Sequence, residues 1–389
     1  MSTLIIQPRA RLFHGHVWVY ATEIQKRAGD PQPGDVVRLQ DVRGKPLGSA
    51  IYNPKSQISA RLFSYRRQDL DQDFFTRRIE RAIKLREAAG ADMRLCRLVW
   101  SESDGLPGVV VDRYGDFLVL QTLTLGMDKR QDMIVQALNE LLKPRGIVQR
   151  NEGAVRLAEG MEQVKGVISG ETPEPFVVRH GGSAFHADLI EGQKTGLYLD
   201  QLDNYQHVAS MAKGRRVLDC FSNQGGFAQA ASLAGAAEVT AVDISEAAIV
   251  IAKKNAEISG AKIHCVAENC FDFLKRQEAA DARYDLIILD PPSFTKSKST
   301  VRDALRGYKE IHLRAMKMLE PGGIFATFTC SHHVSAGEFH SSITEAAVDA
   351  RKVLRRVRTF SQSADHPMLA TIPETEYLRG YAYEVVASW

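Results

Sequence analysis

The chain has 389 residues, 44% of them hydrophobic and 25% charged, with a net charge of +3. This composition is ordinary for a globular protein, and the length favours two or three domains. No stretch approaches the roughly 18 apolar residues of a membrane span, and the first residues lack the apolar core of a signal peptide. The five cysteines form no CxxC pair and no spacing suited to zinc, so a reduced, cytoplasmic protein without bound metal is expected.

Positive charge is concentrated near the N-terminus. Residues 1–70 contain 11 lysines and arginines against 5 acidic residues, a net charge of +6, which leaves about −3 for the remainder. This distribution favours a polyanionic partner, with nucleic acid as the first candidate. A surface that only aids solubility would explain the charge equally well.

Residues 1–71 are predicted to form a β-rich domain. Strands are expected at 35–41 and 46–52, on either side of a turn at Gly44, and again at 58–65. The first two runs flank Arg43, Gly44 and Lys45, which is typical of two short strands joined by a hairpin-like turn.

Residues 72–175 are predicted to form a separate α+β domain. A helix is expected over 72–90, with Gly90 as its stop. Two apolar strands then form a hairpin over 108–123, and a further helix is expected over 127–146, where proline and glycine end it.

From residue 176 onwards, strands and helices alternate. This pattern predicts an α/β domain over 176–389 with a parallel, doubly wound sheet. The last apolar run, 377–388, has no helix after it and is expected to close the sheet edge in the antiparallel sense. Ligands of such sheets bind outside the carboxyl ends of the strands.

A strand, a glycine-containing turn and a helix are predicted over 215–231. Such a turn lets a ligand approach the backbone at a helix N-terminus. Dinucleotide enzymes use GxGxxG for the pyrophosphate, and this turn offers only the adjacent pair Gly225 and Gly226. Asp219, near the end of the strand, is an anion where a diphosphate would be repelled. It suits a cationic group instead, such as the amino group of S-adenosylmethionine (SAM).

Asp243 ends the next predicted strand. A carboxylate at this place can accept hydrogen bonds from both ribose hydroxyls of either cofactor class. The alternative is that Asp243 only caps the helix that begins near Ser245.

These segments resemble class I SAM-dependent methyltransferases over residues 176–389, which implies a Rossmann-like sheet with SAM at the strand ends. The sequence departs from the family at Asn269, which stands where an acid usually holds the adenine amino group. The segment "GQKTGLYLDQ" (192–201) resembles a motif that covers SAM, although its composition also fits a plain loop entering a helix. The cofactor-binding residues that the resemblance implies are Thr195, Tyr198, Asp200, Asp219, Phe221, Ser222, Gly225, Gly226, Asp243, Ile244 and Asn269.

Asp290 follows a strongly apolar predicted strand and opens the segment "DPPSFTKSK". A DPP[FY] tetrad marks methyltransferases that act on amino groups, with the aromatic residue stacking on a flipped base. Here Ser293 fills the aromatic position and Phe294 comes one place later. The sequence therefore weakens the nitrogen-methylation hypothesis without excluding it.

Cys330 ends the strand predicted to neighbour the one before Asp290, and Ser331, His332 and His333 follow it. A thiolate at this position could add to carbon 6 of a pyrimidine and make carbon 5 nucleophilic towards a methyl donor. The alternative is a small buried hydrophobic residue, the usual role of cysteine.

The order of the motifs "GQKTGLYLDQ", "LDCFSNQGGFA", "VDIS", "LDPPSF" and "TCS" behind a basic β-rich domain resembles the bacterial PUA-domain 23S rRNA 5-methylcytosine methyltransferases of the RlmI type. The resemblance covers essentially the whole chain. It implies an RNA-binding PUA domain, SAM as donor, large-subunit ribosomal RNA as partner and cytosine carbon 5 as acceptor. Cys330 falls on the nucleophile position and Asp290 on the position that hydrogen-bonds the cytosine edge.

Three alternatives remain open at the level of sequence. A related family methylates guanine N7, and its DPP turn is also followed by a Ser/Lys-rich stretch like "FTKSKS". A catalytically silent rRNA-binding assembly factor would keep the same fold, although the intact acids and cysteine argue against it. A nicotinamide oxidoreductase is least favoured because GxGxxG is absent. The sequence leaves the oligomeric state open, and a homodimer is among the expected states.

Overall fold

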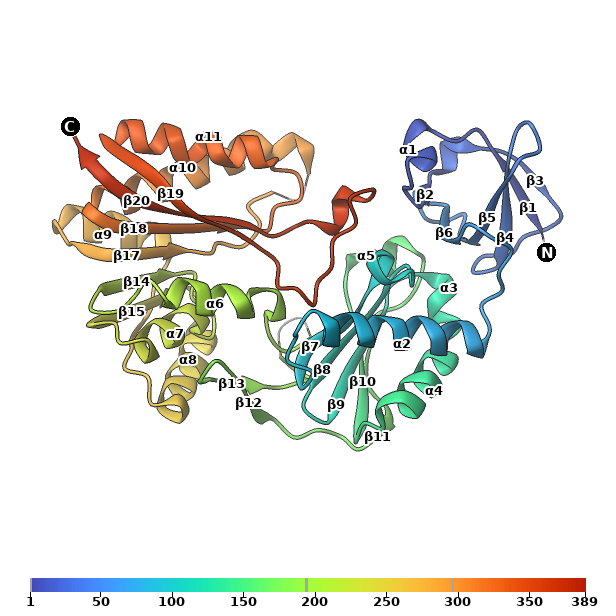
Figure 1. The fold of residues 1–389 in the computed structure, drawn as a ribbon, viewed down its shortest axis with the longest axis horizontal. Helices are drawn as coiled ribbons and strands as arrows, with labels where there is room; N and C mark the ends of the chain where they lie inside the picture. The colour runs from blue at the N-terminus through green and yellow to red at the C-terminus, as the bar shows by residue number, and fades with distance from the viewer. Residues whose placement is uncertain (1, 193–194, 296) are drawn as a thin grey trace. The chain divides into compact units, whose positions relative to one another are not determined.

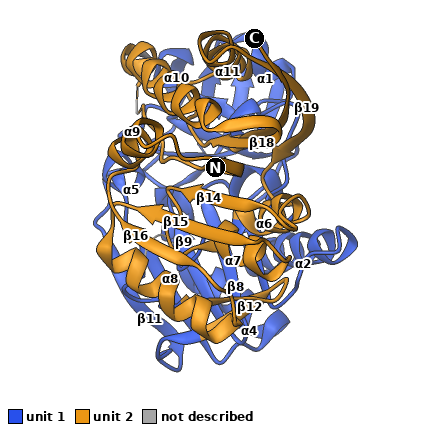
Figure 2. Ribbon diagram, turned by 90° about the vertical axis from the view of Figure 1, so that its left-hand side faces the viewer, with its two compact units in different colours: residues 1–176, 187–199, 364–375 blue, residues 177–186, 200–363, 376–389 orange. Residues whose placement is uncertain are grey.

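The computed structural model describes residues 2–192, 195–295 and 297–389. The chain forms two compact units (Figure 2). The first unit comprises residues 1–176, 187–199 and 364–375, and the second comprises residues 177–186, 200–363 and 376–389. No helix among the described residues combines the length and the apolar character that a membrane crossing requires.

The N-terminal part of the first unit is a six-stranded sheet with the order β2-β6-β5-β4-β1-β3 (Figure 1). Only β1 and β4 pair in parallel; the predicted hairpin joins β4 and β5, and Gly44 supplies its positive φ of 86°. The strands are β1 (Thr3–Ile6), β2 (Trp18–Val19), β3 (Ile24–Ala28), β4 (Val36–Asp41), β5 (Pro46–Tyr52) and β6 (Ala60–Ser64), with helical turns α1 (Ala10–Phe13) and η1 (Ala21–Glu23) between them.

A five-stranded sheet with the order β11-β10-β9-β8-β7 forms the rest of the first unit. The predicted hairpin over 108–123 is present as the antiparallel pair β8 and β9. The elements are β7 (Leu95–Trp100), β8 (Val109–Tyr114), β9 (Phe117–Thr122), β10 (Gly146–Asn151) and β11 (Val164–Gly170), with α2 (Gln72–Ala88), α3 (Leu125–Asp128), α4 (Gln131–Leu142), α5 (Ala154–Ala158), η2 (Ser101–Asp104) and η5 (Pro373–Thr375).

Helix α2 forms where the sequence predicts it. The Asp71 side chain caps its start by accepting a hydrogen bond from the Phe74 backbone N–H at 2.8 Å, and Gly90 follows its end with a φ of 72°. The helix predicted over 127–146 is shorter, since α4 begins at Gln131, after the separate turn α3. It ends at Leu142 because Lys143 already leaves the helical conformation, with a φ of 47°, before Pro144. One apolar core joins α2 to both sheets, since Ile51 and Phe63 pack in the same cluster as Phe74 and Phe75.

The second unit is built on a seven-stranded sheet with the order β16-β15-β14-β17-β18-β20-β19. Its five strands from β16 to β18 are parallel, as predicted. The strands are β14 (Arg216–Cys220), β15 (Glu238–Asp243), β16 (His264–Ala267), β17 (Tyr284–Leu289), β18 (Leu319–Thr329), β19 (Lys352–Ser361) and β20 (Arg379–Ser388). A separate hairpin joins β12 (Phe176–His180) and β13 (Ser183–Ala187).

Helices cover both faces of this sheet. Side chains of α9, α10 and α11 pack on one face, and those of α6 and α7 pack on the other (Figure 1). Alternate strand residues serve the two faces: Leu218 joins the first cluster and Val217 the second. The helices are α6 (Leu202–Ala209), α7 (Gly226–Leu233), α8 (Glu246–Ser259), α9 (Cys270–Ala279), α10 (Val301–Lys317) and α11 (Ala336–Asp349), with the turns η3 (Leu199–Gln201) and η4 (Lys298–Thr300).

The prediction that residues 377–388 close the sheet edge is wrong. Strand β20 is antiparallel as expected, but it lies between β18 and β19, and β19 forms the edge. The sequence of β19, "KVLRRVRTFS", is rich in arginine and mostly exposed. Such charged strands are typical of sheet edges, because exposed charge prevents pairing with another chain.

Candidate active site

The turn between β14 and α7 has an unusual backbone. Phe221, Asn223 and Gly225 adopt left-handed φ values of 63°, 47° and 79°. Asparagine and glycine tolerate this region, whereas phenylalanine is strained there. The turn is held by two hydrogen bonds to β15, from Ser222 N to the Val242 carbonyl at 3.0 Å and from Asn223 N to Asp243 Oδ2 at 2.8 Å.

The two adjacent glycines of the turn meet different requirements. Gly225 caps the start of α7 in a left-handed conformation, which favours glycine. At Gly226, a Cβ atom would come within 2.3 Å of the Tyr205 ring. Gly226 is therefore required for α6 to pack against the start of α7.

Asp219 is completely buried in β14. Its Oδ2 accepts a hydrogen bond from Ala228 N at 3.0 Å, while Oδ1 has no partner among the described residues. Burial, together with the negative charges of Asp290 and Asp243, raises the pKa of Asp219 well above its ordinary value, although the bond from Ala228 opposes the rise. The charges of Asp290 and Asp243 thus oppose a negative charge on Asp219, which is an environment that favours a cationic ligand.

Ser222 lies at the same turn and is 7% exposed. Its Oγ is likewise buried without a hydrogen-bond partner among the described residues. Buried polar atoms are nearly always hydrogen-bonded in folded proteins. The unpaired oxygens of Asp219 and Ser222 therefore fit a bound ligand with a hydrogen-bond donor and positive charge, which describes the methionine part of SAM.

Asp243 ends β15 as predicted and uses both carboxylate oxygens. Oδ2 holds Asn223 N, and Oδ1 accepts a hydrogen bond from Ser245 N at 2.9 Å. The cap of α8 is the Ser245 side chain, which accepts from Ala248 N at 3.2 Å. Asp243 is thus not the helix cap, and each of its oxygens keeps a second lone pair for a ligand.

Two further predicted residues lie where neighbouring strands end. Ile244 follows Asp243 and is 68% exposed, which is unusual for a large aliphatic side chain. Asn269 caps α9, and its Oδ1 accepts a hydrogen bond from Phe271 N at 2.9 Å. The amide oxygen of Asn269, which is expected to accept a hydrogen bond from the adenine amino group, therefore already has one donor. It can accept a second hydrogen bond.

The segment "GQKTGLYLDQ" is divided between the two compact units, and Gln193 and Lys194 lie outside the described residues. In the first unit, the Thr195 hydroxyl donates to Asp112 Oδ2 at 2.6 Å, and Tyr198 is half-buried. In the second unit, Asp200 is buried and accepts a hydrogen bond from the Tyr377 hydroxyl at 2.7 Å.

Asp290 and Cys330 follow adjacent parallel strands, as predicted. Strands β17 and β18 pair up to Leu289 and Thr327, and both Asp290 and Cys330 are half-buried. The carboxyl ends of two neighbouring strands thus present a carboxylate and a thiol at the same edge of the sheet.

A relay of buried amides orients Asp290, and it was not predicted from the sequence. Gln201 Nε2 donates to Asp290 Oδ2 at 2.9 Å, and Asn204 Nδ2 donates to Gln201 Oε1 at 2.7 Å. Both amides are only 2% exposed. The relay fixes which way the carboxylate points, and its only signal in the sequence was the glutamine that ends "GQKTGLYLDQ".

A chain of hydroxyl groups runs beside Cys330 and was also not predicted. The buried Tyr308 hydroxyl hydrogen-bonds Thr329 Oγ1 at 2.8 Å and Ser331 Oγ at 2.9 Å. Ser331 Oγ in turn contacts Ser293 Oγ of the DPP turn at 3.1 Å. Burial is the main cause of the raised pKa of Tyr308, and the charges of Cys330 and Asp290 also raise it.

The aromatic residue after the DPP turn does not stand free. The Phe294 ring packs against Tyr308, Phe271 and Phe221, with centroid distances of 4.7, 5.8 and 6.4 Å. Ser293, which fills the position of the aromatic residue in the tetrad, is exposed. Lys296 of the following Ser/Lys-rich stretch lies outside the described residues.

Two protein families match parts of the chain, and individual relatives match nearly all of it. Residues 7–65 match the family of PUA-like domains, and residues 160–369 match the family described as S-adenosylmethionine-dependent methyltransferase. A protein from Erwinia tasmaniensis named ribosomal RNA large subunit methyltransferase I is 39% identical over 99% of this chain and 100% of its own length. Proteins of the same name from Enterobacter sp. and Photobacterium profundum are 37% and 38% identical over 99% and 98% of this chain and 100% and 99% of their own.

Solved structures agree with these matches in fold. A SAM-dependent methyltransferase from Streptococcus mutans superposes with a TM-score of 0.84 at 21% identity, covering 99% of this chain and 100% of its own. A methyltransferase solved in complex with S-adenosylhomocysteine (SAH) superposes with a TM-score of 0.86, also at 21% identity and with the same coverage.

The sheet, the glycine turn and the family matches define the class: the chain is a SAM-dependent methyltransferase with an N-terminal PUA-like domain. Within that class it belongs to the family of the proteins named ribosomal RNA large subunit methyltransferase I. The predicted fold class, the family resemblance and the SAM cofactor are thereby confirmed.

Proposed function

We propose that this protein transfers a methyl group from SAM to carbon 5 of a cytosine in large-subunit ribosomal RNA, through a covalent bond to Cys330. The three relatives described above match this chain over nearly its full length, and each is named for large-subunit rRNA. The observation that carries the choice of atom is the half-buried thiol at the end of β18, beside the strand that ends at Asp290. Nitrogen methylation has no use for a thiol at that position.

Three of the other four cysteines are buried, while Cys265 is half-buried like Cys330. Burial raises the pKa of Cys96 to about 12, and burial also raises the pKa values of Cys220 and Cys265. Cys270 is buried and its sulfur donates to the Val242 carbonyl at 3.5 Å. A nucleophilic thiol needs access to its substrate and a polar setting, which the end of β18 provides.

The residues of the glycine turn would hold the donor. Asp219 Oδ1 would accept from the amino group, Ser222 and the backbone at Gly225 and Gly226 would contact the methionine part, and Asp243 would hold the ribose. SAM supplies an electrophilic methyl group when it is bound. The remaining contacts would come from Phe221, Ile244 and Asn269 around the adenine and from Thr195, Tyr198 and Asp200 in the covering segment.

The thiolate of Cys330 adds to carbon 6 of the cytosine, and the electrons of the carbon 5–carbon 6 double bond move to carbon 5. Carbon 5 would then form its new bond to the methyl group as the methyl–sulfur bond of SAM breaks, which leaves SAH as the second product. A base removes the proton of carbon 5, the double bond forms again and the thiolate leaves. Asp290, oriented by Gln201, would hold the cytosine edge, which requires the base to leave its stack.

A fluorinated substrate tests the covalent step. RNA with 5-fluorocytosine at the target lacks the proton that elimination removes, so the adduct should persist under denaturing conditions. Wild-type protein and Cys265→Ala, as a matched control, should both give the adduct, and Cys330→Ala should give none. Normal methyl transfer by Cys330→Ala would contradict the proposal, and mass mapping of the product would then reveal nitrogen methylation.

The PUA-like domain would supply RNA affinity rather than chemistry. Its net charge of +6 over residues 1–70 favours contact with phosphates. The affinity for rRNA should therefore fall steeply with salt concentration, while SAM affinity should change little. If the affinities for rRNA and for SAM depended equally on salt concentration, the RNA-binding role of the PUA-like domain would be contradicted.

A further inference from the structure

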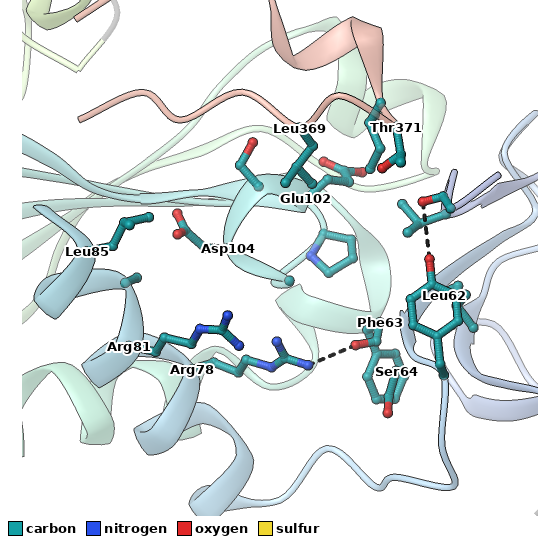
Figure 3. A pocket seen from close by; sticks show the side chains of 18 of the residues that line it. Leu62, Phe63, Ser64, Arg78, Arg81, Leu85, Glu102, Asp104, Leu369 and Thr371 are labelled. Atoms are coloured by element: carbon teal, nitrogen blue, oxygen red, sulfur yellow. Dashed lines mark hydrogen bonds between the residues drawn. The ribbon is translucent and has the colours of Figure 1, made fainter. Parts of the chain in front are cut away.

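A pocket in the first unit lies between the end of β6 and helix α2, outside the residues proposed for methyl transfer. Its volume is about 730 Å³, and Figure 3 shows side chains from both elements pointing into it. Apolar side chains such as Leu62, Pro107 and Ile372 form part of its wall. Four cations also line it, namely Arg66, Arg78, Arg81 and Lys84.

The two acidic residues of the pocket are already neutralised. Asp104 forms a bidentate ion pair with the fully buried Arg86, at 2.6 and 2.8 Å. Glu102 accepts hydrogen bonds from Trp18 Nε1 at 2.8 Å and Arg61 Nη1 at 3.0 Å. Burial raises the pKa of Glu102, but Arg61 and its hydrogen bonds outweigh that effect and leave the pKa lowered. Neither carboxylate is thus available to the lining arginines.

Three guanidinium groups of the pocket have no acidic partner within the described part of the chain. Lys84 pairs with Glu80 at 2.7 Å, whereas no ion pair involves Arg66, Arg78 or Arg81 among the residues that the structure describes. Arg78 and Arg81 project from the same side of α2 into the pocket with their guanidinium groups side by side (Figure 3).

The position of Arg78 is built into the fold. Its Nη2 donates to the Phe63 carbonyl at 3.2 Å, and its guanidinium lies 5.3 Å from the centre of the Phe74 ring. The Arg78 guanidinium also lies over Gly105, where a Cβ atom would come within 2.8 Å of Nη1, and the φ of 69° at Gly105 itself favours glycine. Burial, followed by the charges of Arg81 and Arg77, lowers the pKa of Arg78. An anion bound to the pair would relieve this repulsion.

An aromatic side chain stands on the same pocket. Tyr65 is 62% exposed, yet its hydroxyl donates to the Gly15 carbonyl at 3.1 Å, which fixes the ring. Exposed aromatic rings beside cations are what proteins use to bind single-stranded nucleic acid, because bases stack on the ring while cations hold the backbone.

We propose that this pocket holds one nucleotide of a single-stranded RNA segment, with its phosphate on Arg78 and Arg81 and its base on Tyr65. The inference rests on the proposed function, because RNA is the substrate expected there. It adds a second contact to the substrate, made by α2 together with the PUA-like domain, through residues other than those proposed to hold the reacting base. Arg66 would contact a neighbouring phosphate.

Binding of a labelled oligouridylate of about 12 nucleotides to the full-length protein tests this inference by fluorescence anisotropy. Arg81→Gln should weaken binding about tenfold and reduce the slope of log affinity against log salt by about 0.7, the value for one phosphate on a single strand. Tyr65→Ala should also weaken binding about tenfold, with an unchanged salt slope. The matched control is Arg77→Gln, which removes the same charge from an exposed residue of α2 that pairs with Asp73 outside the pocket.

Equal losses for Arg81→Gln and Arg77→Gln would overturn the proposal, because diffuse charge would then explain the binding. Tighter binding of uridine monophosphate than of the oligonucleotide would also overturn it and assign the pocket to a free nucleotide. Methyl transfer to rRNA separates this inference from the proposed function: Arg81→Gln should raise KM and keep kcat. If the 5-fluorocytosine adduct forms but Arg81→Gln binds the oligonucleotide normally, the proposed function stands and the assignment of the pocket is wrong. If Arg81→Gln binds weakly but no adduct forms, the assignment of the pocket stands and the covalent mechanism is wrong.

Discussion

Asp219→Asn should stabilise the free protein and weaken SAM binding. The carboxylate is fully buried, and one of its oxygens has no partner among the described residues. Because the pKa of Asp219 is raised in the folded state, its ionised form opposes folding once the pH exceeds the unfolded pKa, and stability falls as the pH rises towards the folded pKa. The neutral amide removes this cost and keeps the shape, so the melting temperature without ligand should rise at neutral pH.

The effect on binding follows from the number of free acceptors. Oδ2 is occupied by Ala228 N, so only Oδ1 remains for the amino group of SAM. One charge-assisted hydrogen bond is worth about 1.5–3 kcal/mol, and its loss should raise the Kd roughly 10- to 150-fold. Calorimetric titration with SAM and thermal unfolding without ligand measure the two effects separately.

Asp272→Asn is the matched control, because Asp272 is an exposed residue in the first turn of α9. It should leave both SAM affinity and stability nearly unchanged. Unchanged SAM affinity in Asp219→Asn would refute the assignment of the amino group. A lower melting temperature would refute the argument that the buried charge opposes folding.

Four further outcomes follow from the geometry. Asp243→Ala should weaken SAM binding at least about tenfold by calorimetry, since it loses charge-assisted bonds. Gln201→Leu should leave Asp290 without its orienting donor and lower kcat for methyl transfer more than it changes the SAM Kd. Tyr308→Phe should lower the free energy of unfolding by about 1–3 kcal/mol in a denaturant titration, because two buried hydroxyls each lose one hydrogen bond. Gly226→Ala should cost about 1–3 kcal/mol in the same titration by overpacking against α6.

The sequence predicts the second unit well where each strand is apolar and ends in a polar residue. Asp243 and Asp290 could be predicted as site residues, because an acid at the end of an apolar run has few structural roles. Strand β19 was overlooked, since its arginine-rich sequence hides the alternation that marks a strand. With β19 missing, the last strand was wrongly placed at the sheet edge.

Contacts between distant residues could not be predicted. The bond from Gln201 to Asp290 joins positions 89 residues apart, and the chain from Tyr308 to Ser331 spans 23 residues. Both depend on how helices pack on the sheet, which no local pattern encodes. The division of the chain at residues 71 and 175, and the homodimer, stay predictions. Because Ile51 and Phe63 share a core with α2, point variants test the RNA-binding role better than removal of residues 1–71.

The electrostatics of the second unit explain why its site residues stand out in the sequence. Asp219, Asp243 and Asp290 interact unfavourably with one another, and a protein selected only for stability would replace the buried one. A cationic ligand reverses the sign of that interaction, so the arrangement is favourable only in the bound state. Local rules of folding are violated most often where function requires it. The same reasoning applies to Arg78 and Arg81 in the first unit, where the repulsion is between cations and the missing partner is an anion.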